Sequence, residues 1–129
     1  MSNELFLEVS HIRIRIKNII ANKTDKTRIL IESFAIKNKN KITYRYEDTS
    51  YNIILGEEIF LIRETKDYIH KFIFKLDNIT KSEYYIKELN TSIDVMIKTT
   101  KLTKKDSKIE IDYEIIDTNT KYSFILDME

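Results

Sequence analysis

The sequence predicts an all-β protein, an antiparallel up-and-down barrel of about eight to ten strands. Runs of alternating apolar and polar residues recur along the chain, short polar segments separate them, and no stretch shows convincing amphipathic-helix spacing. A closed barrel is favoured over an open sheet because the chain has no proline and one glycine. It therefore has few of the devices that keep free sheet edges from associating.

The clearest alternation lies in residues 92–116, which we interpret as a β-hairpin. The apolar sides of its two strands are Ile93, Val95, Ile97 and Thr99, then Ile109, Ile111, Tyr113 and Ile115. A period of two is that of a strand with one buried face. The link, residues 103–107, is polar and too short for a crossover helix, so the strands should pair antiparallel. We expect ion pairs across the opposite, solvated face, from Asp94 and Lys98 to Glu110, Asp112 and Glu114.

The other predicted strands, in chain order, cover residues 12–17, 28–37, 42–47, 51–55, 58–64, 68–76 and 122–129. Residues 28–37 and 51–62 are largely apolar on both faces, which favours a further buried surface and self-association. In the turn at residues 38–41 we expect asparagine to adopt the positive φ that glycine usually takes. Residues 80–83 fit a capping box that would begin a short helix, but the Tyr and Ile that follow favour a strand.

Composition limits the class of protein. The chain has 129 residues, of which 42% are hydrophobic and 33% charged, which fits a single globular domain over residues 1–129. The net charge of +1 gives no electrostatic case for nucleic acid or an anionic membrane as a partner. No cysteine is present, which excludes disulfides and thiol chemistry. Residues 1–8 lack an export signal and no segment is apolar enough to span a membrane, so we expect a cytoplasmic protein.

The order of segments resembles the YwiB-like family, small bacterial proteins of unknown function with a calycin-like β-barrel. The segments that carry the resemblance are residues 12–20, 41–47 with a Tyr-x-Tyr-Glu ending, 58–63 ending in arginine, Tyr85 followed by 92–102, and 108–114, Lys-Ile-Glu-Ile-Asp-Tyr-Glu. Residues 64–65 and 90–91 stand where the family usually has glycine. The resemblance implies a calycin-like barrel along nearly the whole chain, and it implies no catalytic residue, cofactor or substrate.

The residues themselves show no catalytic motif. The sequence contains no glycine-rich phosphate loop, no zinc-protease motif and no nucleophile elbow, and its two histidines, His11 and His70, lie in separate strands without metal-ligand spacing. We therefore expect a protein that is not an enzyme and has no metal or cofactor. His70 shares a stripe with Phe72 and Phe74, which favours a structural role over ligand or acid-base work.

Two groups of charged residues are candidate binding sites. Arg13, Arg15 and Lys17 line one face of a strand, where a solvated surface paired with Asp127 or Glu129 is favoured over an anion site. Arg63 shares its face with Ile59 and Leu61 near a strand end, where the mouth of a barrel would lie. A buried arginine needs a partner, and this partner is either a structural carboxylate or the anionic head of an apolar ligand. The tyrosines expected around it are Tyr44, Tyr46, Tyr85 and Tyr113.

The sequence leaves two functions open. The first is a binding protein whose barrel holds a small apolar or amphiphilic molecule, with Arg63 and the four tyrosines as candidate ligand-binding residues. The alternative is a filled barrel that acts as a protein-interaction or homodimerisation module. A barrel of about eight strands is just wide enough for either.

Overall fold

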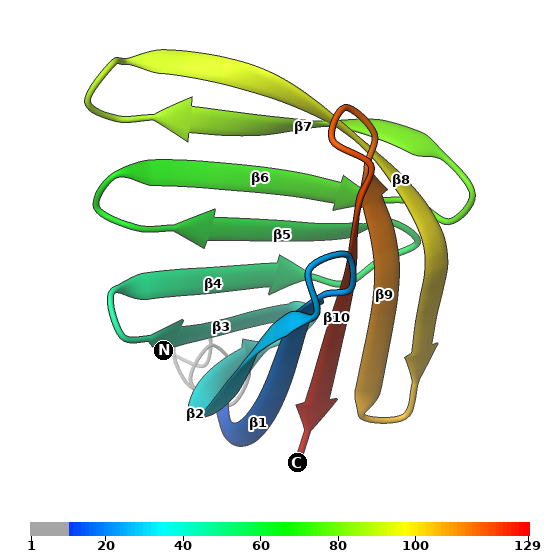
Figure 1. Ribbon diagram of the computed structural model, residues 1–129. Helices are drawn as coiled ribbons and strands as arrows, with labels where there is room; N and C mark the ends of the chain where they lie inside the picture. The colour runs from blue at the N-terminus through cyan, green and yellow to red at the C-terminus, as the bar shows by residue number, and fades with distance from the viewer. Residues whose placement is uncertain (1–10) are drawn as a thin grey trace.

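The computed structural model describes residues 11–129 and forms a closed, antiparallel ten-stranded barrel, which confirms the predicted all-β fold (Figure 1). The strands are β1 (His11–Asn22), β2 (Thr27–Asn38), β3 (Lys41–Tyr46), β4 (Thr49–Ile54), β5 (Ile59–Glu64), β6 (Tyr68–Phe74), β7 (Ile79–Ile86), β8 (Thr91–Lys105), β9 (Lys108–Ile115) and β10 (Thr120–Met128). Each strand pairs with its neighbours in sequence, and β1 pairs with β10 to close the barrel.

The strands form two sets that cross steeply. Figure 1 shows β3 to β7 running in roughly one direction across the sheet, while β9, β10 and β1 run across them; β8 begins beside β7 and then bends to continue beside β9. The segment that fitted either a helix or a strand is strand β7, so the helix interpretation of its capping box is wrong. Ser82 of that segment is 1% exposed and donates a hydrogen bond to the Val95 carbonyl, 2.9 Å away, so it serves the barrel rather than a helix end.

Alternate residues of every strand contribute buried side chains to the barrel interior. The side chains with the least exposure are Phe74, Ile31, Ile42, Ile53, Ile59, Ile97, Ile109, Ile111 and Leu126. The predicted inward stripe of the 92–116 hairpin is confirmed for Ile97, Thr99, Ile109, Ile111 and Tyr113. Ile93 departs from it: 48% of this side chain is exposed, because it lies at the beginning of the long strand β8, where the strand leaves the packed interior.

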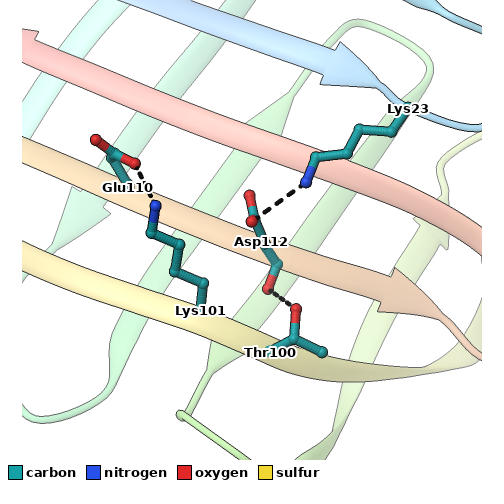
Figure 2. Close-up of polar contacts among 5 residues, drawn as sticks. All are labelled: Lys23, Thr100, Lys101, Glu110 and Asp112. Carbon is teal, nitrogen blue, oxygen red and sulfur yellow. Dashed lines mark hydrogen bonds and ion pairs between the residues drawn. The ribbon is translucent and has the colours of Figure 1, made fainter.

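The outer face of this hairpin is arranged differently from the prediction. A register shift between Thr99 and Lys101 inserts Thr100 as an extra residue, so Lys101 comes to the outer face. Figure 2 shows the result: Lys101 pairs with Glu110 at 2.8 Å, and Thr100 donates a hydrogen bond to the Asp112 carbonyl. Asp112 pairs with Lys23, at 3.2 Å. Of the predicted β8 partners, Lys98 lies opposite Glu114 but makes no ion pair within residues 11–129, and Asp94 pairs instead with Lys81 of β7, at 3.6 Å.

Strand β1 corrects a second set of predicted ion pairs. β1 does lie beside β10, and Lys17 is in register with Asp127, but within residues 11–129 neither makes an ion pair. Arg13 and Arg15 instead place their guanidinium groups over the Phe34 ring of β2, at 3.9 and 5.2 Å from its centroid. The two arginines therefore make cation–π contacts with an exposed ring, where ion pairs with Asp127 or Glu129 were expected.

The hairpin turns use left-handed residues that are not glycine. Positive φ occurs at Lys26, Lys39, Glu47, Asp77, Asn90, Asp106 and Asn119. In the 38–41 turn the residue with positive φ is Lys39 (φ 58°), so the expectation that an asparagine would take this conformation is wrong. The chain's one glycine, Gly56, does not have positive φ. Each such side chain is held in a conformation that costs about 1 kcal/mol or more relative to glycine.

Lys39→Gly should raise the free energy of unfolding by about 0.5–1 kcal/mol, because glycine adopts positive φ without steric cost. Urea denaturation measures the change. Lys41→Gly is the matched control: Lys41 begins strand β3, where glycine weakens the strand. Equal effects of the two substitutions would contradict the assignment of strain to Lys39.

The predicted absence of an export signal concerns residues 1–8, which lie outside the described residues, so it stays a prediction. Along residues 11–129, the structure contains no apolar helix of membrane-spanning length.

Candidate functional site

A cavity of about 270 Å³ lies inside the barrel, at the end closed by the β1–β2 turn. Strands β1, β2, β5, β6, β9 and β10 contribute to its wall. The lining residues are Ile20, Asn22, Thr27, Arg28, Ile29, Arg63, His70, Phe72, Tyr113, Ile115 and Tyr122. Phe74, which is fully buried, packs against the rings of Phe72 and Tyr113, so the packed core begins directly behind this wall of the cavity.

Arg63 lies in the wall of this cavity because the alternation of β5 turns it inward with Ile59 and Leu61. The strand register places it between Tyr51 of β4 and His70 of β6. Its guanidinium carbon lies 5.7 Å from the Tyr68 ring centroid and 5.8 Å from that of Phe72.

The Arg63 side chain has no ionic partner among the described residues. No carboxylate in residues 11–129 forms an ion pair with it, and its buried Nε has no hydrogen-bond partner. A structural arginine–carboxylate pair, one of the two expectations from the sequence, is therefore not found in this part of the chain. A half-buried guanidinium without a counter-ion is costly unless something else neutralises it.

His70 is the second polar group at the cavity. Its side chain is 6% exposed and packs against Phe72, with ring centroids 3.7 Å apart, and edge-on against Tyr84. Nε2 lies 3.4 Å from the Ser82 hydroxyl, whereas the buried Nδ1 has no hydrogen-bond partner. Burial, and secondarily the charge of Arg63, lower the pKa of His70 to about 4, so the ring is neutral at pH 7.

Tyr113 and Tyr122 form the aromatic side of the cavity. They face each other in the β9–β10 register, and their rings stack with centroids 5.3 Å apart. Burial raises the pKa of the Tyr113 hydroxyl, and the nearby Arg63 charge opposes that rise only in part. The phenol therefore remains protonated and is a hydrogen-bond donor at neutral pH.

The structure brings together two of the five residues predicted for a ligand site. Arg63 and Tyr113 line the cavity, whereas Tyr44, Tyr46 and Tyr85 are not among its lining residues. Tyr46 is half-buried against the hydrophobic core. The Tyr85 hydroxyl donates to the side chain of Asn90, in the turn that follows β7.

Tyr44 is committed to a buried hydrogen-bond chain. Its hydroxyl donates to the Asn18 side chain at 2.7 Å, and the Asn18 amide donates to the Ile125 carbonyl at 2.8 Å. Asn18 is fully buried, and burial raises the pKa of Tyr44 well above its usual range. This chain ties β3 to β1 and β10, so it stabilises the barrel where the sheet closes.

Sequence reasoning missed Tyr122 and Arg28 as cavity residues. Tyr122 could have been found from the hairpin register, because it lies directly opposite Tyr113. Arg28 gave a weaker signal, a charge at the beginning of an otherwise apolar strand. With Arg63 it makes the lining cationic: of the described residues, no aspartate or glutamate lines this cavity.

The groups at the cavity suit an anion better than a metal. Arginine and a protonated phenol are donors, and they match carboxylate or phosphate oxygens. Along residues 11–129, no three His, Cys, Asp or Glu side chains come close enough together to hold a metal ion.

No family model and no curated protein matches this sequence. Among solved structures, the chain is similar to the ywiB protein from Bacillus subtilis, with a TM-score of 0.68 and 14% sequence identity. The alignment covers 96% of this chain and 97% of that one. A likeness at this identity shows the fold alone, and the conclusion it supports is that residues along nearly the whole chain form a YwiB-like barrel.

Proposed function

We propose that this barrel is a non-enzymatic binding protein for a small amphiphile with an anionic head group. The observation that carries the proposal is Arg63, whose guanidinium faces an internal cavity and has no carboxylate partner among the described residues. A bound anion would supply the missing counter-charge, and a charge-assisted hydrogen bond to it contributes about 1.5–3 kcal/mol.

The remaining lining residues fit an apolar tail. Ile20, Ile29, Phe72 and Ile115 offer hydrocarbon and ring surface, and the Tyr113 and Tyr122 rings close one side. At about 270 Å³ the cavity is smaller than the ~300–1,000 Å³ typical of drug-sized ligands. The ligand is therefore a short-chain or single-ring anion rather than a long lipid.

Octanoate and octanol test this proposal because they share a chain and differ in charge. Calorimetric titration should show that the protein binds octanoate more tightly than octanol, and Arg63→Met should weaken octanoate binding by about tenfold or more. The loss should leave octanol binding nearly unchanged. Arg45→Met is the matched control, because Arg45 is exposed on β3 and does not line the cavity.

A second readout separates a binding arginine from a structural one. An anion held beside Arg63 would offset the guanidinium charge and raise the pKa of His70, which NMR titration of the ring follows. If octanoate and octanol both fail to bind, and native mass spectrometry of protein from its own host shows no small molecule, the proposal is wrong. Arg63 would then affect thermal stability alone.

A further inference from the structure

Part of strand β2 has an edge that no other strand of residues 11–129 covers. It pairs with β1 along its whole length, but its ladder with β3 covers only residues 35–38. Of the strands in residues 11–129, none pairs with residues 27–34 on the side away from β1. A free edge presents unpaired backbone N–H and C=O groups, which are a template for pairing with another strand.

The outer face beside this edge is apolar and exposed. Leu30, Phe34 and Ile36 share the outer face of β2, and their side chains are 42%, 49% and 44% exposed. Single exposed apolar side chains are common, but a contiguous group of them marks an interaction surface. The edge and the face together therefore suit a β-strand with apolar side chains.

Residues 28–32, Arg-Ile-Leu-Ile-Glu, are complementary to themselves. If two copies of this segment pair antiparallel about a two-fold axis at Leu30, Arg28 of each copy lies opposite Glu32 of the other, and Leu30 lies opposite Leu30. Arg28, Leu30 and Glu32 share the outer face, because Ile31 is fully buried inside the barrel. Neither Arg28 nor Glu32 makes an ion pair within residues 11–129.

We propose that two copies of this chain form a symmetric dimer by pairing their β2 edges antiparallel, with Leu30 on the two-fold axis. Two Arg28–Glu32 pairs then flank a Leu30–Leu30 contact, and such cross-strand pairs stabilise a sheet. Arg28 and Ile29 also line the rim of the cavity, so the second copy lies beside the cavity mouth. The dimer does not depend on a ligand, and Arg63→Met should leave it intact.

Charge reversal tests the register. By analytical ultracentrifugation the unmodified protein should be a dimer, and Arg28→Glu or Glu32→Arg should each raise its dissociation constant about tenfold or more, because each places like charges opposite one another twice. The double variant should dimerise again. Mixing the two single variants should give a heterodimer, since each chain then supplies the charge that the other lacks. That recovery excludes misfolding as the cause.

A cross-link tests the position of the axis, because the natural chain has no cysteine. Under mild oxidation, the Leu30→Cys variant should form a covalent dimer, since residues opposite each other in an antiparallel pair have Cα atoms about 4.5–5.5 Å apart, within disulfide range. Phe60→Cys is the control, at a position 37% exposed on the outer face of β5. The proposal would be overturned if the unmodified protein were monomeric at every concentration tested. It would also be overturned if the protein formed a dimer whose dissociation constant did not change on charge reversal and whose Leu30→Cys variant did not cross-link.

Discussion

Phe74→Ala should lower the free energy of unfolding by about 3–5 kcal/mol, the usual cost of deleting a buried aromatic ring. Phe74 is completely buried in the barrel interior, and its ring centroid lies 5.5 Å from that of Phe72 and 4.9 Å from that of Tyr113. Those rings are held by their own strands and cannot collapse into the space. Since small domains have a total stability of about 5–15 kcal/mol, the variant should be close to unfolding in mild denaturant.

Phe60→Ala is the control for this prediction because the chemical change is identical. Phe60 lies on β5, beside β6, and its side chain is 37% exposed on the outer face. Its substitution should cost about 1 kcal/mol or less. Urea denaturation of both variants gives the comparison. If the two losses were similar, the interior around Phe74 would not be the packed core of the barrel.

Acid should destabilise the protein through His70 by about 3 kcal/mol between pH 7 and pH 4. Its pKa is about 4 in the folded chain, against an ordinary value of 6.5, because burial and the Arg63 charge disfavour the protonated ring. Between these two values the unfolded chain binds more protons than the folded one, so stability falls as the pH falls. Each unit of difference corresponds to about 1.4 kcal/mol, which sets the size of the expected loss.

The His70 contribution is measured as a difference between variants, because carboxylates also titrate in this range. Unfolding free energies of the unmodified protein and of His70→Asn, taken at several pH values, should diverge between pH 7 and pH 4. His11→Asn is the control, since His11 is exposed, and it should keep the full acid dependence. Parallel curves for the unmodified protein and His70→Asn would mean that the folded chain protonates His70 as readily as the unfolded one.

The barrel could be predicted because side-chain alternation is a local property. Inward residues of β9, such as Ile109 and Ile111, are separated by single polar residues, and a period of two leaves little choice of structure. The Lys101–Glu110 ion pair could not be predicted, because the bulge at Thr100 shifts every later residue of β8 to the other face. Lys101, which pairs with Glu110, was on the wrong face in a strict alternation.

The site was predictable in part for a similar reason. Arg63 stands out because a charge on an apolar stripe is rare, and alternation alone turns it inward. Its surroundings depend on register between strands, which the sequence does not state. Register places His70 and Tyr51 beside it, and it puts Tyr85 opposite Ile69, on the other face of the sheet from His70. Arg28 lines the cavity in a part of β2 that is not paired with β3. The point at which the two strands separate depends on strand curvature, which the local sequence pattern does not predict.

The closure of the barrel by β1 and β10 has a consequence for how the chain folds. Every other ladder joins strands adjacent in sequence, so each hairpin can form from a short turn at low entropic cost. The β1–β10 contact between Asn18 and Ile125 spans 107 residues, and closing such a loop costs roughly 3 kcal/mol more than closing a turn of about four residues. Nearly all the topological cost of folding is therefore concentrated in one seam, and the buried Tyr44–Asn18–Ile125 chain of hydrogen bonds lies across it. We therefore expect the rate-limiting event in folding to be the meeting of the two ends of a nearly complete sheet.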